Sequence, residues 1–403
     1  MAGTRPIQPA DGGDWDESRP ERRRKAVRYA VPLAVAGVAA ATIGLVPALA
    51  DSSSDDDPDL PAVSAEELIA KVAGSDAEEL SGTVRITTDL GLPALPIGGS
   101  FTGGARDGGD ASAAAPESKL AELAAGTHTL RVAADGAARQ RVSIIEDAAE
   151  YSLIHNGDDV WAYDSATNSV YHATADDKAG GRGHRGGPKD FQGLGDATPR
   201  ELARKVLAAV NGSTAVKVDG STKVAGRDAY QLLIQPRQAG STVGSVRIAV
   251  DADTGVPLKF TLQPRGGGKA AVDAAFTSVD FKAPKAGVFS FTPPKGAEVT
   301  EADRAKARAG GGRAADLLSG LNVVGDGWAS VAELHISDTP LSGKDALAAR
   351  QFLDGLGRKV KGEFGTGTVL STRLINVLLT DDGRILVGAV DRNTLVKAAD
   401  AAE

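Results

Sequence analysis

The chain of 403 residues is long enough for about two or three domains. Its formal net charge of −8 argues against a nucleic-acid partner, because phosphate binding needs clusters of lysine and arginine that acidic residues do not cancel. Cysteine is absent, which excludes disulfides, a thiolate nucleophile, a cysteine-based zinc site and a lipidated N-terminal cysteine. Any attachment to a membrane must therefore come from the polypeptide itself.

The N-terminal segment predicts a tail followed by a membrane-crossing helix. Residues 1–28 are rich in glycine, proline and charge and lack periodicity, so we expect a disordered cytoplasmic tail that ends in a basic cluster. Residues 29–50 carry no charge, and as a helix they would span about 33 Å, against a hydrocarbon core of about 30 Å. The basic cluster before them and the acid-rich residues 51–59 after them predict a single-pass protein of the cell membrane with its C-terminal part outside.

A cleaved secretory signal is the alternative interpretation of the same segment. Ala48, Leu49 and Ala50 stand before Asp51 and fit the small-residue pattern of a cleavage site. The protein would then be secreted after cleavage near Ala50. A blot that compares the mature mass with the full-length mass separates the two interpretations, because cleavage removes about fifty residues.

Residues 62–300 predict an α+β domain. Ser64 and Glu67 form a capping-box pattern that opens a helix through about Ala73. The short stretches that follow alternate apolar and polar residues, which is typical of an antiparallel sheet with one covered face. We therefore expect a curved antiparallel β-sheet, an incomplete barrel, covered by helices. A second capped helix is expected at 198–210, long loops at 91–126 and 175–195, and strands at 83–87, 129–132, 141–144, 151–155, 160–163, 170–172, 215–218, 227–235, 245–250, 258–263 and 271–281.

The apolar members of these strands would line the space that such a sheet encloses. Trp161 and Tyr163 sit two apart beside a predicted hairpin turn, and they would either line a ligand cleft or form an aromatic pair in the core or at an edge. The candidate ligand-binding residues are Val84, Ile86, Leu130, Val132, Val142, Ile144, Trp161, Tyr163, Leu232, Ile234, Ile248 and Phe260.

The C-terminal part predicts a linker and a small module. Pro293 and Pro294 end the strand region, and the charged, alanine-rich residues from Glu298 to Arg313 suggest a helical linker, with 301–313 as the connection between domains. Residues 314–403 predict a small α+β module. Its expected elements are a helix at 345–356, a hairpin formed by 369–379 and 384–390, and a last helix that begins at Asn393.

Signatures of catalysis and of metal binding are weak. Residues 181–186 match the pattern GxGxxG but neither follow a strand nor open a helix, so they indicate a flexible loop. Residues 251–255 resemble the start of a calcium loop without its later carboxylates and favour a hairpin turn. The five histidines lack the spacing of a metal site, and no GxSxG motif is present. We therefore predict no catalytic activity, no metal and no cofactor.

Four stretches of the strand region resemble a known family. They are GDDVWAYDSATNSVYH (157–172), VAGRDAYQLLIQP (224–236), VDADTGVPLKFTLQ (250–263) and VDFKAPKAGVFSFTPPKGAEV (279–299), of which the last two are the more specific. They resemble the LolA-like family of lipoprotein-carrier and sensor domains, which includes the sensor half of RseB-type regulators. The resemblance covers residues 62–300, and the alanine, glycine and arginine bias is similar to that of high-GC Gram-positive bacteria.

The resemblance implies an incomplete antiparallel barrel that is covered by helices and whose cavity takes lipid or lipoprotein acyl chains without catalysis. Burial of an acyl chain contributes about 0.8 kcal/mol per methylene. The membrane segment at 29–50, the insertion at 91–126 and the C-terminal module depart from the family pattern. A tether argues against a freely diffusing carrier. The alternative that follows is a sensor of envelope stress or of lipoproteins that regulates a membrane-protein partner such as an anti-sigma factor.

Overall fold

A computed structural model of the chain describes most of the region after residue 57. The described residues are 58–91, 114–116, 119, 122–174, 203–204, 207, 212–302, 322–335 and 357–402. The predicted tail at 1–28, membrane segment at 29–50, GxGxxG loop and helix at 345–356 lie outside them, as do most of the loops at 91–126 and 175–195, the helix at 198–210 and the linker at 301–313. No helix among the described residues has the length and apolar character needed to span a bilayer.

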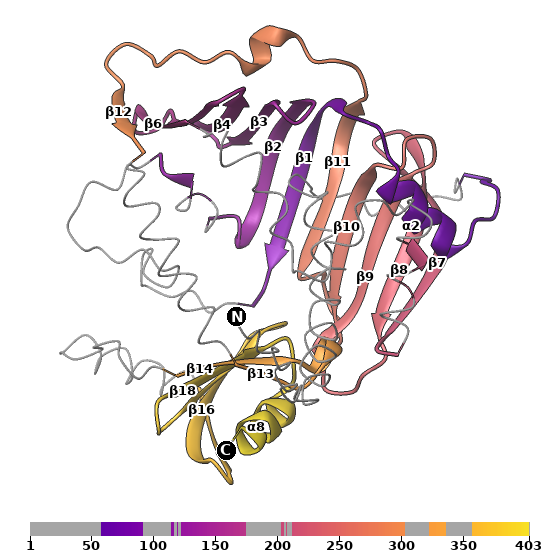
Figure 1. Cartoon of the computed structure of the whole chain (residues 1–403), viewed down its shortest axis with the longest axis vertical. Coiled ribbons are helices and arrows are strands. Elements are labelled where there is room, and N and C mark those ends of the chain that lie inside the picture. Colours follow the sequence, from indigo (N-terminus) through magenta and orange to yellow (C-terminus); the bar gives the residue numbers. More distant parts are fainter. Residues whose placement is uncertain are drawn as a thin grey trace, which may run out of the picture.

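The fold is mostly β, and its largest element is a sheet of twelve strands in the described part of the chain (Figure 1). In spatial order the strands are β12 (Glu298–Glu301), β6 (Ser169–Thr174), β5 (Asp159–Asp164), β4 (Glu150–Asn156), β3 (Arg139–Ile145), β2 (Ala125–Asp135), β1 (Glu79–Asp89), β11 (Val272–Asp280), β10 (Pro257–Pro264), β9 (Val243–Asp251), β8 (Arg227–Pro236) and β7 (Thr214–Val224). Two meanders, β1–β6 and β7–β11, meet where β1 pairs with β11. The alternation of apolar and polar residues thus predicted the strands of both meanders.

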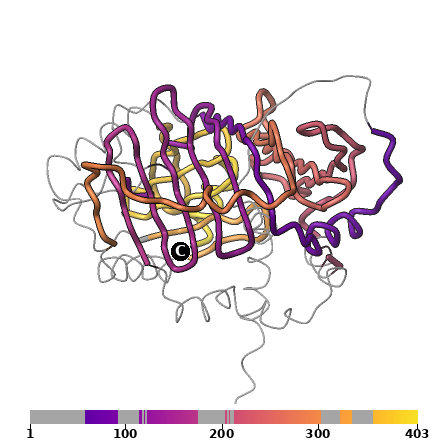
Figure 2. Tube along the Cα trace, turned by 90° about the horizontal axis from the view of Figure 1, so that it is seen from above, coloured from indigo at the N-terminus to yellow at the C-terminus, as the bar shows by residue number. Residues whose placement is uncertain are grey.

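Strand β12 makes the sheet mixed, which corrects the expectation of a purely antiparallel one. After β11 the chain crosses past the strands of the first meander and joins the free edge of β6 in the parallel direction (Figures 1 and 2). This crossing segment consists of residues 281–297 and contains the 3₁₀ helix η2 (Ala286–Phe289). The expected linker helix from Glu298 is wrong at its start, because Glu298–Glu301 pairs with β6 instead. A free strand edge offers backbone partners that local composition does not reveal.

One described helix covers part of the sheet. The helix α2 (Ala65–Ala73) begins with the predicted capping box, in which Ser64 Oγ accepts a hydrogen bond from the backbone N–H of Glu67 at 3.1 Å and the Glu67 carboxylate accepts one from Ser64 N–H at 2.9 Å. The helix packs against β7 and β8. Leu68 is buried there in an apolar cluster with Tyr230 and Leu232. At the other end of the sheet, the Tyr151 hydroxyl donates to the Ala114 carbonyl at 3.1 Å and Leu123 packs against the apolar residues of the first meander.

The C-terminal part forms a second, antiparallel sheet of six strands among the described residues. Its order is β13 (Asn322–Val324), β14 (Val331–His335), β18 (Arg384–Gly388), β17 (Asn376–Thr380), β16 (Gly365–Ser371) and β15 (Arg358–Gly362), and it is accompanied by the 3₁₀ helix η3 (Gly327–Ala329) and the helix α8 (Arg392–Ala401). The strand expected at 369–379 is two strands, because Thr372 and Ile375 close a turn between β16 and β17. The last helix begins at Arg392, where Asp391 caps the N–H of Thr394 at 2.8 Å.

The second sheet is joined to one end of the large sheet by polar contacts. Arg373 donates its backbone N–H to the carbonyl of Leu90 at 2.9 Å and pairs its guanidinium with Asp89 at 2.6 Å. Thr242 donates to the carbonyl of Ala389 at 2.9 Å in the connection between β8 and β9. These contacts hold the second sheet beside the C-terminal end of β1 and the connection between β8 and β9, as Figure 1 shows.

Candidate functional site

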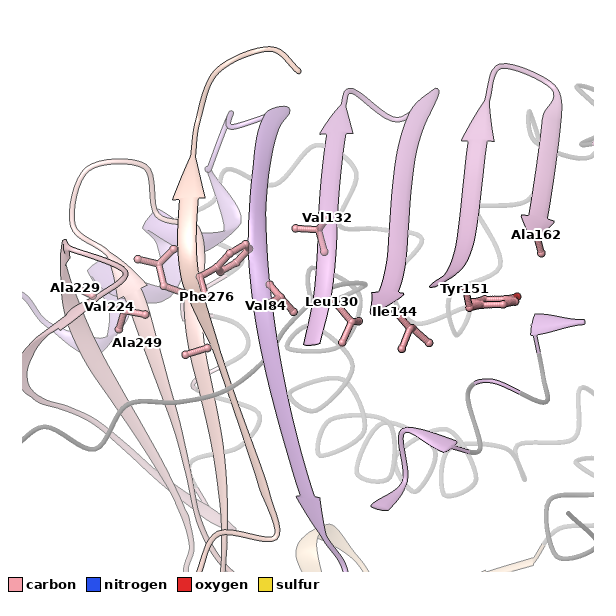
Figure 3. Packing of buried hydrophobic residues seen from close by; sticks show 12 residues of the cluster. Val84, Leu130, Val132, Ile144, Tyr151, Ala162, Val224, Ala229, Ala249 and Phe276 are labelled. Carbon is pink, nitrogen blue, oxygen red and sulfur yellow. The ribbon is translucent and has the colours of Figure 1, made fainter. Parts of the chain in front are cut away.

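Ten of the twelve candidate residues lie on one face of the large sheet. Directly paired residues share a face, and residues two apart along a strand do too. The register pairs Ile144 with Leu130, Leu130 with Val84, and, further along, Phe260 with Ile248 and Ile248 with Leu232. This apolar face therefore carries Val84, Ile86, Leu130, Val132, Val142, Ile144, Leu232, Ile234, Ile248 and Phe260, several of which Figure 3 shows on successive strands.

The protein's own atoms cover the two halves of the apolar face unequally. On β7–β10 it is covered by Leu68 of α2 and by Leu374 and Trp328 of the second sheet. Seven of the ten residues are buried, namely Val84, Leu130, Val132, Ile144, Leu232, Ile234 and Ile248. The other three, Ile86, Val142 and Phe260, are only partly buried. On the β1–β6 half, Ile86 and Val142 have the partly buried neighbours Leu153 and Tyr171. Partly buried candidates therefore remain on both halves, Ile86 and Val142 on the first meander and Phe260 on the second.

A group of ion pairs stands at the β5 end of the apolar face. Lys119 is buried, and its Nζ lies 3.0 Å from Glu146, 3.3 Å from Glu122 and 3.5 Å from Asp164. Burial alone lowers the pKa of Lys119, but the hydrogen bond to Glu146 and the surrounding carboxylates outweigh it and raise the pKa above its usual value. Lys119 therefore stays protonated and is paired with carboxylates, which indicates a structural role.

Trp161 and Tyr163 lie on the opposite face from the other ten candidates. Tyr163 pairs with Ser152, whereas Tyr151 of the apolar face pairs with Asp164. The indole of Trp161 stacks on the ring of His172 with centroids 3.7 Å apart, and both aromatic residues contact Phe291 of the crossing segment at 5.5 and 5.6 Å. Trp161 and Tyr163 therefore form an aromatic group with Phe291 between the sheet and the crossing segment.

The same opposite face holds a cavity of about 620 Å³ beneath the crossing segment. Its wall includes Arg131 and Ser143 from the sheet, and Pro284, Lys285 and Val288 from the crossing segment. This lining mixes apolar and polar residues. No local pattern in the sequence indicates the cavity, because its two walls come from segments far apart in the chain.

Arg141 lines this cavity and is the centre of a hydrogen-bond network there. Its guanidinium donates to the Val288 carbonyl at 3.1 Å, to the Glu150 carboxylate at 3.1 Å and to Ser152 Oγ at 3.1 Å. Burial alone raises the pKa of Glu150, but hydrogen bonds from Ser152, Ser143 and Arg141 outweigh it and hold the pKa below its usual value. The network therefore ties the crossing segment to β3 and β4, and its charged groups are already paired.

Residues 251–255 form a hairpin turn, as the sequence favoured over a calcium loop. Asp251 is 1% exposed, and its Oδ1 accepts hydrogen bonds from the backbone N–H groups of Asp253 and Thr254 at 3.1 and 2.8 Å. Its other oxygen pairs with the guanidinium of Arg227. Among the described residues, no cluster of histidine and carboxylate side chains is arranged to hold a metal ion.

Replacing Asp251 by asparagine is expected to reduce the acid sensitivity of the fold. Burial alone raises the pKa of Asp251, but Arg227 and Thr254 outweigh it and lower the pKa in the folded state. A depressed folded pKa contributes stability above the unfolded value of about 3.9, and this stability is lost as the pH falls through the folded pKa. Urea unfolding between pH 6 and pH 2 should show a smaller loss for Asp251→Asn than for the wild type. Asp253→Asn, at a side chain 85% exposed, should behave like the wild type, and an unchanged slope for Asp251→Asn would contradict the assignment.

No known family model and no curated protein matches the sequence. Among solved structures, the chain is similar to MucB in the Pseudomonas aeruginosa MucA/MucB complex, with 17% identity, a TM-score of 0.39, and coverage of 83% of this chain and 96% of that chain. A LolA superfamily protein from Nitrosomonas europaea has 12% identity and a TM-score of 0.20, with coverage of 57% and 99%. A putative outer membrane lipoprotein-sorting domain from Vibrio parahaemolyticus has 12% identity and a TM-score of 0.21, with coverage of 56% and 95%. The chain is thus similar in structure to MucB and to LolA superfamily proteins, at low sequence identity.

Proposed function

We propose that the protein is a non-catalytic, extracytoplasmic binding protein whose apolar face takes the acyl chain of a lipid or lipoprotein. The observation that carries the proposal is the continuity of the apolar face through ten paired strands, from β6 through Val142 on β3 to Leu232 on β8. Burial of apolar surface drives such binding at about 0.8 kcal/mol per methylene. Ile86 and Val142 on the first meander would take the chain, since the β7–β10 half is already covered.

The charged groups of the described residues support binding over catalysis. Glu150 is tied to Arg141, Asp251 to Arg227, and Lys119 to three carboxylates. A catalytic acid or base needs a perturbed pKa together with access to a substrate. Each of these groups is instead held in a contact that stabilises a turn or joins two segments.

A series of saturated fatty acids tests the proposal. Binding should tighten about fourfold for each added methylene, until the chain exceeds the length of the apolar face. Native mass spectrometry of the purified protein should also find co-purified lipid. Affinity that does not change with chain length, together with protein that carries no lipid, would contradict the proposal.

A matched pair of variants on β3 locates the binding surface. Val142→Gln places an amide on the apolar face and should weaken fatty-acid binding by about tenfold or more, because an unpaired amide is costly beside an acyl chain. Ile145→Gln makes a similar change on the opposite face of the same strand, at a residue that is also partly buried, and should leave binding unchanged. Equal effects of both variants on binding would place the ligand elsewhere.

The domain limits and the anchor belong to the same proposal. Residues 62–300 would form the binding domain, 301–313 the linker and 314–403 the C-terminal module, with residues 29–50 holding the binding domain at the outer face of the cytoplasmic membrane. Membrane fractionation followed by a mass blot tests the anchor, and limited proteolysis tests the linker. A protein that is recovered only as a soluble species about fifty residues shorter would replace the anchor with a cleaved signal.

A sensor that regulates a membrane-protein partner is the second candidate. The junction between the sheets favours it, since Leu374 and Trp328 of the second sheet pack into the same cluster as Leu232 and Ile248 of the apolar face. A ligand on that face could therefore alter contacts of the second sheet. Cross-linking in cells should then capture an anti-sigma factor or kinase more strongly without ligand than with it, and capture that ignores ligand would leave only the binding role.

A further inference from the structure

The crossing segment is fastened to the sheet at its far end by an ion-paired histidine. His172 on β6 lies between two carboxylates: its Nε2 is 2.9 Å from Asp159 on β5, and its Nδ1 is 2.8 Å from Glu301 on β12. Among the described residues, these are the charged groups that face the ring. Glu301 is the last residue of β12, so the contact joins the end of the crossing segment to the body of the sheet.

This geometry requires a protonated imidazole. A neutral imidazole has one N–H donor and one acceptor nitrogen, whereas both partners here are carboxylates that only accept. The imidazolium alone can donate to both oxygens. Burial by itself lowers the pKa of His172, but the hydrogen bonds to Asp159 and Glu301 and their charges outweigh it and raise the pKa. The face of Trp161, stacked 3.7 Å away with an interplanar angle of 14°, also favours a cation.

Strand β12 has little else to hold it. It has four residues, three of which are exposed, and its Val299 is 44% exposed instead of being packed into a core. Its attachment otherwise rests on backbone hydrogen bonds to β6, such as Glu298 N–H to the Asn168 carbonyl at 3.1 Å and Ala302 N–H to the His172 carbonyl at 2.7 Å. A short edge strand without buried apolar side chains gains little from packing, so the histidine contact adds to the backbone pairing that holds it.

We propose that Asp159, His172 and Glu301 form a proton-controlled clasp that keeps β12 on the edge of β6. A histidine whose folded pKa is raised contributes stability that is fully present below its unfolded pKa and is lost as the pH rises through the folded pKa. The clasp is therefore closed in mildly acidic conditions and opens as the pH rises. Opening frees the backbone edge of β6 for strand pairing.

Hydrogen exchange of the purified full-length protein, measured between pH 5.5 and pH 9, tests the clasp. After correction for the intrinsic pH dependence of exchange, the protection of residues 298–302 should fall as the pH passes through the pKa of His172, as measured by NMR on histidine-labelled protein. Glu301→Gln keeps the size of the side chain and removes its charge. This variant should lower the pKa of His172. For each pKa unit by which the wild-type value exceeds that of the variant, the protection of residues 298–302 in the wild type should fall about tenfold across the titration.

Two further variants separate the clasp from a general loss of folding. His172→Gln should leave residues 298–302 weakly protected at every pH, while exchange in β9 and β10 stays as in the wild type. His128→Gln is the matched control, because the His128 ring bonds to the Ala125 carbonyl at 2.8 Å and not to a carboxylate. In this variant the protection of residues 298–302 should depend on pH as in the wild type. Protection of residues 298–302 that ignores pH in the wild type, or that titrates identically in Glu301→Gln, would overturn the proposal.

Discussion

Replacement of Phe276 by alanine is expected to lower the free energy of unfolding by about 3–5 kcal/mol. Phe276 is 3% exposed on β11 and pairs with Val84 of β1, where the two meanders meet. The truncation removes the transfer free energy of the ring and leaves a cavity that the paired strands close only in part. Guanidinium unfolding followed by circular dichroism measures the change.

Phe281→Ala provides the comparison for this variant. Phe281 is only partly buried, and its ring lies 4.9 Å from the guanidinium of Arg227 at the start of the crossing segment. Its truncation should therefore cost less than half as much. Equal losses for the two variants would mean that the β1–β11 pairing relaxes around the missing ring, and that the apolar face is less rigid at its centre than its burial indicates.

Replacement of Glu333 by alanine should destabilise the second sheet by about 3 kcal/mol, the lower end of the range for breaking a buried ion pair. Glu333 is 1% exposed, lies 3.5 Å from the guanidinium of Arg384 and accepts a hydrogen bond from Asn322 at 2.8 Å. Its removal leaves the buried Arg384 with the carboxylate of Asp382 at 2.8 Å as its remaining ion-pair partner. Hydrogen exchange of β14 and α8 resolves this loss from the unfolding of the large sheet.

A double variant distinguishes a lost ion pair from a lost side chain. Glu333→Leu combined with Arg384→Met replaces both charges by apolar groups of similar volume, which is often neutral for a buried pair. The double variant should therefore recover most of the stability that Glu333→Ala loses. If it is less stable than the single variant, the charges themselves hold the sheet together.

The sequence predicted the parts of the fold that depend on local pattern. The alternation around Val84 and Val142 identified β1 and β3 and the face to which these residues belong, because each apolar residue is flanked by polar ones. The capping box formed by Ser64 and Glu67 predicted the start of α2, because this pattern also depends only on residues close together in sequence. In each case a few neighbouring residues carry the whole signal.

The pattern fails where alternation is absent or the partner is distant. Val160, Trp161, Ala162 and Tyr163 are all apolar or aromatic, so nothing in β5 indicates which face is covered or that Trp161 and Tyr163 lie opposite the other ten candidates. Strands β13, β14 and β15 were not predicted. β13 has three residues, β14 buries the charged Glu333, and β15 has a single apolar residue among basic ones and glycine. β12 depends on the free edge of β6, which no local pattern shows.

The cavity and the clasp on the opposite face differ in how much of each could be predicted from the sequence. The cavity beneath the crossing segment brings Lys285 next to Arg131, and nothing local links the two residues. The clasp had a usable signal. The predicted hairpin between β5 and β6, once its register is set by Asp164 and Ser169, places Trp161 opposite His172. Glu301 still required the long return of the crossing segment.

The meeting of β1 with β11 has a consequence for how the chain folds. Thr83 and Ser278, which are joined there, stand 195 positions apart, whereas the other antiparallel neighbours in each meander follow one another in sequence. Closing a loop of that length loses far more chain entropy than forming a hairpin, so this pairing comes late. During synthesis from the N-terminus, β1 waits as an unpaired edge until β11 has emerged. The nascent chain is then most exposed to strand-mediated aggregation, and a holding chaperone would act in that interval.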